Sequence, residues 1–340
     1  MTDSAARPII NALTIDVEDY FQVSAFERVV ARERWGDYES RVAANTDRLL
    51  GILADAGVRA TFFVLGCVAE RDRSIVHRIS AAGHEIASHG YGHRLVYHQT
   101  PDEFREDVRR GKAVLEAAGG QEVRGYRAPS FSITERSLWA LDILIEEGFT
   151  YDASIFPIHH DRYGIPTAPR HAFWFSAGAG ITGLAAAGVV EAGTARASQG
   201  VPRASGGVAG SSRGATPGTP LWRGSFAARS EGAGAGLLEI PGSTIRVGGV
   251  NFPVGGGGFF RLLPYWWTRA GIRRLNETEG RPAIFYLHPW EVDPNQPRLA
   301  ASRLSRFRHY CNLAKTEPRL RRLLSDFRFG PLAETVAAAV

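Results

Sequence analysis

Three carboxylates lie within four residues at the end of an apolar segment near the N-terminus. Residues 9–15 are almost continuously apolar, and Asp16, Glu18 and Asp19 follow directly. Acidic side chains this close repel one another, so a cation or a shared proton is needed to hold them together. The cluster therefore predicts either a metal site or a site of acid–base chemistry.

Two histidines further along could complete a metal site with these acids. His89 and His93 form an H-x3-H pair, a spacing that brings two imidazoles within reach of one metal ion, on one helical turn or on the loop that starts one. Alone, the pair is equally consistent with solvated or core histidines. Beside a carboxylate cluster it indicates a metal, and two histidines with one carboxylate suit zinc, and also iron or cobalt.

Three more polar residues follow apolar segments. Arg127, in Arg-Ala-Pro, could hold a carboxylate with two parallel hydrogen bonds. Asp152 considered alone is typical of a turn or a helix cap, and a single histidine such as His288 is more often structural than catalytic. Each of these residues, however, falls at the same end of a predicted strand, where α/β barrels build their active sites.

The segments that must position these residues alternate between strands and helices. This alternation is typical of a barrel or a doubly wound sheet, and the nearly unbroken apolar strands indicate a parallel sheet covered on both faces. The apolar patterns predict strands at 9–15, 61–65, 84–88, 123–127, 237–241 and 282–288, and helices at 45–57, 75–82, 100–118 and 134–147.

The C-terminal part departs from this alternation. Four glycines at 255–258 predict a flexible turn that leads into an aromatic helix start at 259–267. Residues 300–327 are basic and predict a helix broken near Pro318. The arginines of this helix are typical of a solvated helix face.

Between residues 176 and 236 the periodic pattern is lost. This segment holds 15 of the 38 glycines, and it is rich in alanine, serine and arginine. Such a composition buries too little apolar surface to offset its ordering entropy, so we expect an inserted, mostly disordered surface loop. The segment also carries +3 of the formal net charge of +5. The nearly neutral remainder gives no indication of a nucleic-acid-binding face.

Two further features bound the class of protein. Cys67 and Cys311 are too few for a disulfide framework or a cysteine-ligated zinc site. Neither a signal-peptide pattern nor an apolar run of about 18 residues is visible, so the sequence predicts a cytoplasmic protein without a transmembrane segment.

The order of the motifs resembles that of a known enzyme family. Thr-Ile-Asp…Glu-Asp, His-x3-His, Arg-x-Pro, Tyr-Asp and Leu-x-His follow one another between Thr14 and His288, as in the NodB-type polysaccharide deacetylases, a carbohydrate esterase family. The sequences of residues 16–26 and 256–265 further resemble those of the subgroup found beside exosortase (PEP-CTERM) exopolysaccharide loci.

This resemblance implies a fold and an activity. The fold would be a deformed (β/α)7 barrel made of residues 1–175 and 237–292, with a low-complexity disordered insertion at 176–236 and a helical C-terminal extension at 293–340. The activity would be the metal-dependent removal of N-acetyl groups from an amino-sugar-containing polysaccharide or a lipid-linked oligosaccharide, with Zn2+ as the expected metal and Co2+ or Fe2+ as alternatives.

The resemblance also implies a role for each polar residue. Asp16 would be the general base and Arg127 would orient it. His288 would protonate the leaving amine, and Asp152 would be paired with His288. His89 and His93 would be metal ligands.

Two departures from the family pattern leave points open. The family usually has two adjacent aspartates, base then ligand, whereas Val17 follows Asp16 here. Strand alternation favours Glu18 as the third ligand, but a turn could bring in Asp19 instead. Ser130 also stands where the Arg-x-Pro motif usually has an aromatic residue, so the groove wall and the choice of substrate stay open.

Two other functions fit the same residues. The barrel could hydrolyse a small amide or ureide, which a panel of small amides would test. It could instead be a non-catalytic glycan-binding module in which Trp266, Trp267 and Trp290 stack on sugar rings, and an absence of bound metal would favour this alternative.

Overall fold

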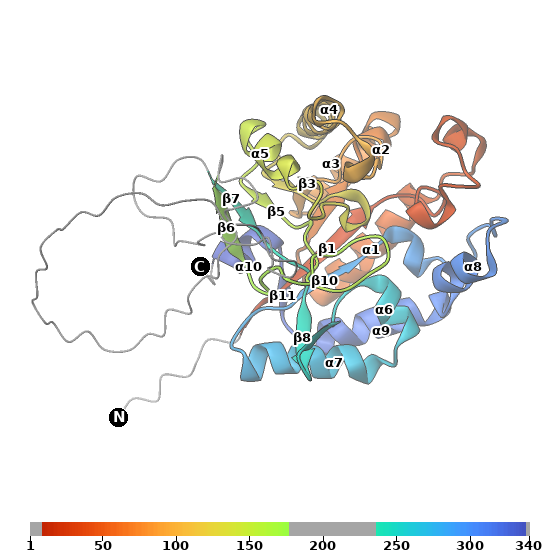
Figure 1. Cartoon of the computed structure of the whole chain (residues 1–340). Coiled ribbons are helices and arrows are strands. Elements are labelled where there is room, and N and C mark those ends of the chain that lie inside the picture. The colour runs from red at the N-terminus through yellow and green to blue at the C-terminus, as the bar shows by residue number, and fades with distance from the viewer. Residues whose placement is uncertain (1–8, 177–235, 338–340) are drawn as a thin grey trace, which may run out of the picture.

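The computed structural model describes residues 9–176 and 236–337. The expected disordered loop at 176–236 therefore lies almost entirely outside the described residues. Figure 1 shows the strands at the centre of the molecule with helices around them. No helix of the described chain is long and apolar enough to cross a membrane.

A parallel sheet forms the centre of the fold. Neighbouring strands are parallel from β10 to β7, and β6 pairs antiparallel with β7 at one edge. This sheet of strands and covering helices confirms the expected α/β fold of the deformed (β/α)7 type. The strands in sheet order are β10 (Ile284–Leu287), β1 (Asn11–Val17), β2 (Thr61–Val64), β3 (Glu85–Ser88), β4 (Gly125–Tyr126), β5 (Tyr151–Asp152), β7 (Gly236–Glu239) and β6 (Phe173–Ser176).

The helices begin and end where local chemistry places them. At the start of α4, the Thr100 hydroxyl accepts a hydrogen bond from the Glu103 amide, and the Glu103 carboxylate accepts one from the Thr100 amide. Gly57 ends α1 with a φ of +63°. The helices are α1 (Val42–Ala56), α2 (Gly66–Arg71), α3 (Arg73–Ala81), α4 (Pro101–Gly119), α5 (Trp139–Glu146), α6 (Gly257–Leu262), α7 (Tyr265–Arg273), α8 (Arg303–Tyr310), α9 (Leu313–Asp326) and α10 (Leu332–Ala337).

Several predicted boundaries differ from the structure. The expected helix at 134–147 begins only at Trp139. The C-terminal helix continues through Pro318, and its break lies instead at Asn312, whose φ of 53° separates α8 from α9. Strand β6 and the hairpin of β8 (Thr244–Val247) and β9 (Val250–Pro253) were not predicted.

The sheet also shows how the chain leaves and rejoins the barrel. Ser176 and Gly236, which flank the segment outside the described residues, are register partners on β6 and β7. The C-terminal residues return to the same sheet, because β11 (Phe329–Gly330) pairs with the start of β1 and α9 packs against α1. The C-terminal segment is therefore packed on the barrel.

Candidate functional site

The carboxyl ends of the parallel strands open into one cleft of about 790 Å³. Polar residues at or just after the ends of β1, β3 and β10 line its floor, as expected where parallel strands end together. The predicted residues that line it are Asp16, Glu18, His89, His93 and His288.

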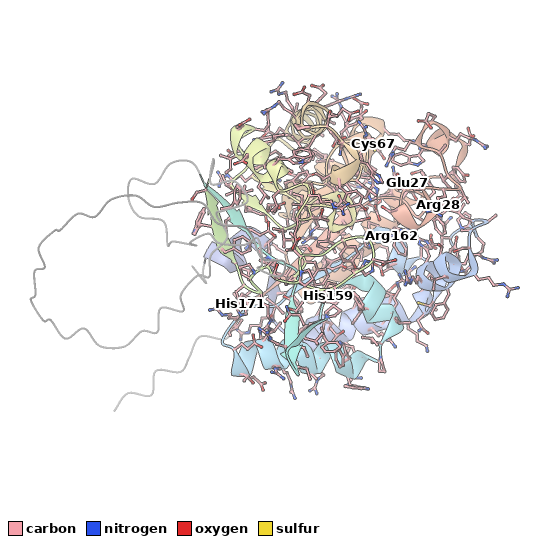
Figure 2. The ribbon with its side chains drawn as sticks, in the orientation of Figure 1. Glu27, Arg28, Cys67, His159, Arg162 and His171 are labelled. Carbon is pink, nitrogen blue, oxygen red and sulfur yellow. The ribbon has the colours of Figure 1, made fainter. Side chains whose placement is uncertain are left out.

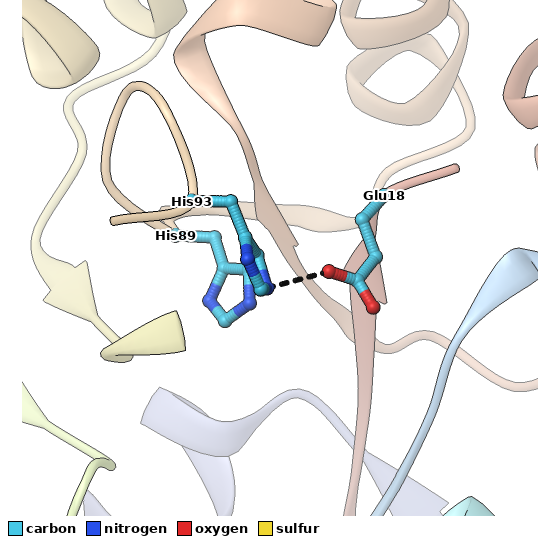
Figure 3. A group of neighbouring side chains, drawn as sticks. All are labelled: Glu18, His89 and His93. Carbon is cyan, nitrogen blue, oxygen red and sulfur yellow. Dashed lines mark ion pairs between the residues drawn. The ribbon is translucent and has the colours of Figure 1, made fainter. Parts of the chain in front are cut away.

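Three of these residues form a compact group of candidate metal ligands. One ligand atom from each of Glu18, His89 and His93 lies within 4.8 Å of the others, and all three residues are buried. Glu18 comes from the end of β1, whereas both histidines come from the loop after β3, as Figure 3 shows. Glu18 Oε2 lies 2.7 Å from His93 Nε2.

The donor set fits a divalent cation. His89 Nδ1 lies 2.8 Å from the Arg127 carbonyl oxygen. A carbonyl only accepts, so Nδ1 carries the hydrogen and Nε2 keeps its lone pair. Burial lowers the pKa of His89 to about 4, so the ring is neutral. Glu18 Oε2 is buried and makes no hydrogen bond, despite its short distance to His93. A cation shared with the histidines would satisfy this atom.

The charge of Glu18 is set by its neighbours. Burial alone would raise the pKa of this carboxyl, but His93 and the other nearby histidines outweigh burial and lower the pKa to about 2. Trp290 also donates its indole N–H to Glu18 Oε1 at 3.3 Å. Glu18 is therefore ionised at neutral pH, as a metal ligand must be.

The loop that carries the histidines is held in a strained conformation. His93 has a φ of 50°, and Gly90 has a φ of 75°. Asp107 of α4 accepts hydrogen bonds from the Tyr91 and Gly92 amides at 2.8 and 3.2 Å. A Cβ at Gly90 would lie 2.7 Å from the Asp107 carboxylate. No sequence motif pointed to Asp107. The sequence showed only that an acidic residue lies on a face of the predicted helix whose other residues pack inward.

Asp19 lies outside this group. Its carboxylate accepts hydrogen bonds from the Ser40 hydroxyl at 2.7 Å and from the Arg41 amide at 3.0 Å. These donors precede α1, so Asp19 holds the start of that helix. The structure thus brings Glu18, and not Asp19, to the histidines.

Asp16 is fixed by Arg127. Arg127 Nη1 donates to Asp16 Oδ1 at 2.7 Å and to the Thr14 hydroxyl at 2.8 Å. Arg127 Nε donates to the Ala153 carbonyl at 3.2 Å, and the guanidinium lies 4.2 Å from the centre of the Phe63 ring. Both members of the ion pair are almost fully buried. Arg127 thus fixes Asp16 Oδ1, while Oδ2 lies 3.9 Å from His288 Nε2.

His288 is paired with Glu291, an acid that none of the sequence motifs included. Its Nδ1 lies 2.6 Å from Glu291 Oε1, and Arg261 Nε donates to Glu291 Oε2 at 2.6 Å. Burial alone would lower the pKa of His288, but Glu291, Glu18 and Asp16 raise it to about 9. His288 is therefore protonated at neutral pH. The spacing of Glu291, three residues after His288 and in the first turn of a short helix, was the available signal.

The expected pair between Asp152 and His288 does not form. Asp152 Oδ1 accepts a hydrogen bond from the Ser154 hydroxyl at 2.5 Å, and Asp152 is the register partner of Glu239 on β7. Burial raises the pKa of Asp152 to about 6, and burial together with Asp152 raises the pKa of Glu239 well above its ordinary value. The physical reason for the difference is position, because the register of β5 on β7 places Asp152 beside Glu239.

Aromatic rings form part of the cleft wall. Ser130 has a φ of 52°, its hydroxyl lies 2.7 Å from that of Ser24, and the next residue, Phe131, turns its ring to within 5.0 Å of the Tyr286 ring. Phe131 thus supplies an aromatic wall beside the serine. Of the three tryptophans considered for sugar stacking, Trp290 lines the cleft, stacked between His288 at 5.1 Å and His309 at 4.1 Å.

Two family models match the chain. Residues 36–145 match the model described as polysaccharide deacetylase, and residues 211–337 match a domain of unknown function, DUF3473. The second match includes His288 and Glu291. It is consistent with the subgroup that the sequence resembles.

Curated relatives match part of the chain. A peptidoglycan-N-acetylglucosamine deacetylase of Bacillus cereus is 35% identical over 98 residues, which cover 28% of this chain and 36% of the relative. A chitooligosaccharide deacetylase of Sinorhizobium fredii is 33% identical over 100 residues, covering 29% of this chain and 44% of the relative. The chain thus spans less than half the length of these relatives.

A solved structure shares the overall fold. This protein from Mycobacterium smegmatis, which is named for the polysaccharide deacetylase family, has a TM-score of 0.53 and 18% identity to this chain. The match covers 96% of this chain and 92% of the other. At this identity the likeness supports the fold.

Proposed function

We propose that this chain, which carries a polysaccharide deacetylase domain of the NodB type, is a metal-dependent hydrolase that removes N-acetyl groups from an amino-sugar-containing glycan. One observation supports this most strongly. A buried group of two histidines and one carboxylate shares a cleft floor with a fixed carboxylate, Asp16, and a protonated imidazole, His288. Amide hydrolysis needs these three functions close together.

Glu18, His89 and His93 would hold the metal. A divalent cation there, most simply Zn2+ and otherwise Co2+ or Fe2+, would polarise the acetamide carbonyl and lower the pKa of a water. We assign the third ligand to Glu18 over Asp19, because the carboxylate of Asp19 already accepts hydrogen bonds from Ser40 and Arg41.

The chain's own residues would move the protons. Asp16, oriented by Arg127, would take a proton from the water that attacks the acetamide carbon. The carbon–nitrogen bond then breaks, and His288 Nε2 donates its proton to the departing amine. The products are acetate and a free amino sugar. His288 and Asp16 lie within 3.9 Å of each other, so both can reach one substrate group.

The proposed substrate is a glycan chain of exopolysaccharide synthesis, either the polymer or its lipid-linked precursor. The resemblance to the exosortase-associated subgroup supports this context, as does the DUF3473 match. The cleft volume of about 790 Å³ also exceeds what a small ureide would fill, which favours a sugar chain over the small-amide alternative.

Acetate release from N-acetylated oligosaccharides tests this proposal. We expect release that a chelator abolishes and that added Zn2+ or Co2+ restores, and we expect Asp16→Asn to remove most of it. Asp37→Asn is a matched control, because Asp37 is exposed and pairs with Arg34 on the surface. Undiminished release by Asp16→Asn, or no release with any metal restored, would refute the proposal.

Metal content tests the ligand assignment separately. Glu18→Ala should lower the bound metal per chain, and Asp19→Ala should leave it unchanged. The reverse result would assign the third ligand to Asp19. Full metal content in both variants would show that neither acid is a ligand.

A further inference from the structure

One face of helix α8 is apolar and uncovered. The opposite face packs on the segment around Phe26, whose ring lies 4.7 Å from the His309 ring and 6.1 Å from the Tyr310 ring. Leu304 and Phe307 are each 57% exposed. Residues three apart lie on the same side of a helix, so these two side chains form one patch.

Cations surround this apolar patch. Residues 294–316 contain no aspartate or glutamate, and they contain five cationic residues, all exposed. Arg303 lies one turn before Phe307, and Arg308 lies one turn after Leu304, so the two arginines flank the patch. Among the described residues, no ion pair links Arg303, Arg306 or Arg308 to an acid. The five cations are Arg298, Arg303, Arg306, Arg308 and Lys315.

The opposite side of the cleft mouth continues the same surface. Val29 is 49% exposed and lines the cleft together with Leu304. Arg28 and Arg162 line it as well, and Figure 2 shows both on the side of the molecule from which α8 projects. Two exposed acids lie beside them: Glu27, which is paired with Arg32 at 3.1 Å, and Asp161, which lies 3.1 Å from His160 Nδ1. The arginines that line the mouth, Arg28, Arg162 and Arg308, outnumber these two acids.

We propose that α8 and the adjoining cleft mouth dock on an anionic membrane surface. Leu304 and Phe307 would enter the boundary between headgroups and acyl chains, and Arg303 and Arg308 would contact lipid phosphates. Interfacial helices likewise bury an apolar face at this boundary and present flanking cationic side chains to anionic lipids. A solvated helix face, which the arginines alone indicated, gives no reason for two large apolar side chains to be exposed at its centre. A glycan could bind the arginines of α8, but it would offer no apolar partner to Leu304 and Phe307.

Docking here would place the catalytic cleft at the bilayer. Leu304 and Arg308 line the same cleft as His288, so the mouth would face the surface on which a lipid-linked oligosaccharide displays its first sugars. This consequence rests on the proposed function, whereas membrane binding does not. The two can therefore fail separately, because vesicle binding requires no turnover.

Vesicle flotation with the full chain tests the docking surface. We expect the protein to float with vesicles of phosphatidylcholine containing about a quarter phosphatidylglycerol, to bind pure phosphatidylcholine much less, and to dissociate as salt screens the charges. Leu304→Ser with Phe307→Ser should weaken binding at least about tenfold. Arg303→Gln with Arg308→Gln should weaken it about fivefold per arginine.

A matched control lies on the β8–β9 hairpin. Val247 is 47% exposed and Arg246 is exposed beside it, so Val247→Ser with Arg246→Gln removes the same kinds of side chain from another element. This variant should bind vesicles as the unchanged chain does. Circular dichroism and the midpoint of denaturant unfolding, measured on all variants, show that each is folded.

Four outcomes would overturn the proposal. The first is the absence of binding to anionic vesicles, and the second is binding that the α8 substitutions leave unchanged. The third is concentration-dependent dimerisation that the Leu304 and Phe307 substitutions abolish while vesicles bind nothing, which would make the patch an interface between copies. The fourth is binding to a soluble polyuronate with none to vesicles, which would assign the arginines to a glycan.

Discussion

Glu291 and Asp152 are buried to the same extent but in opposite electrostatic surroundings. Both are 0% exposed, and burial alone would raise the pKa of each carboxyl. Glu291 lies between two cations, Arg261 and His288, which lower its pKa to about 2. Asp152 lies beside a second acid, Glu239, and its pKa is about 6. At equal burial the neighbours decide the pH at which an acid gains its charge, and only Glu291 is placed to stabilise a protonated His288.

Removing the Glu291 carboxylate should have the largest effect. Glu291→Ala leaves Arg261 buried without its partner, and breaking a buried ion pair in this way costs about 3–5 kcal/mol. The free energy of unfolding, measured with denaturant at pH 7, should fall by that amount. Asp152→Ala removes no cation's partner and should cost clearly less. Equal losses of unfolding free energy in the two variants would show that the cations beside Glu291 do not set the two acids apart.

A conservative change at the same position should separate stability from catalysis. Glu291→Gln keeps the shape of the side chain but removes the charge that holds the His288 imidazolium, so acetate release should fall about 100-fold, mainly in kcat. Asp152→Asn should lower kcat by less than about tenfold, since its carboxyl contacts Ser154 and lies beside Glu239, and not beside His288. Steady-state kinetics on a soluble oligosaccharide measure both. A larger loss in Asp152→Asn would return the pairing role to Asp152.

Sequence patterns predicted the group of polar residues at the strand ends better than the surroundings of Glu291 and Asp152. The acids after β1, the H-x3-H pair and Arg127 could be brought together from strand ends alone, because parallel strands end at one edge. The role of Glu291 depends on Arg261, thirty residues earlier on α6, and no local pattern shows that contact. The surroundings of Asp152 depend on strand β7, which begins only at Gly236. Long-range register and packing, which a linear pattern does not contain, decided both.

Local conformation explains the remaining differences from prediction. Pro318 was expected to break the C-terminal helix, yet α9 continues through it as its sixth residue, and the break falls at Asn312, which takes up a left-handed conformation. Phe131 likewise reaches the cleft wall through backbone angles at residues 130 and 131 that the sequence does not indicate.

Two adjacent glycines give a more selective test of the Glu291 site. A Cβ at Gly257 would lie 1.8 Å from Glu291 Oε1, whereas a Cβ at Gly258 would meet nothing within 4 Å. Gly257→Ala should therefore displace the Glu291 carboxylate, lower the free energy of unfolding by about 1–3 kcal/mol and reduce acetate release. Gly258→Ala is the matched control and should leave both unchanged. Equal stability and equal acetate release in the two variants would show that the close approach of Glu291 to Gly257 affects neither property.

The smallest effect should be the pH dependence of the Asp152 region. The pKa of Asp152 is raised from 3.8 to about 6 in the folded chain, so its favourable contribution is present below about pH 4 and is lost as the pH rises through 6. Asn does not ionise, so Asp152→Asn removes this loss of stability at higher pH. The stability of the variant relative to the unchanged chain should therefore increase between pH 4.5 and 7.5, by on the order of 1–3 kcal/mol. Glu291 has the opposite sign, because its lowered pKa makes its contribution disappear only in strong acid. Denaturant unfolding at several pH values measures the difference, and parallel curves for the two chains would show that the pKa of Asp152 is not raised in the folded chain.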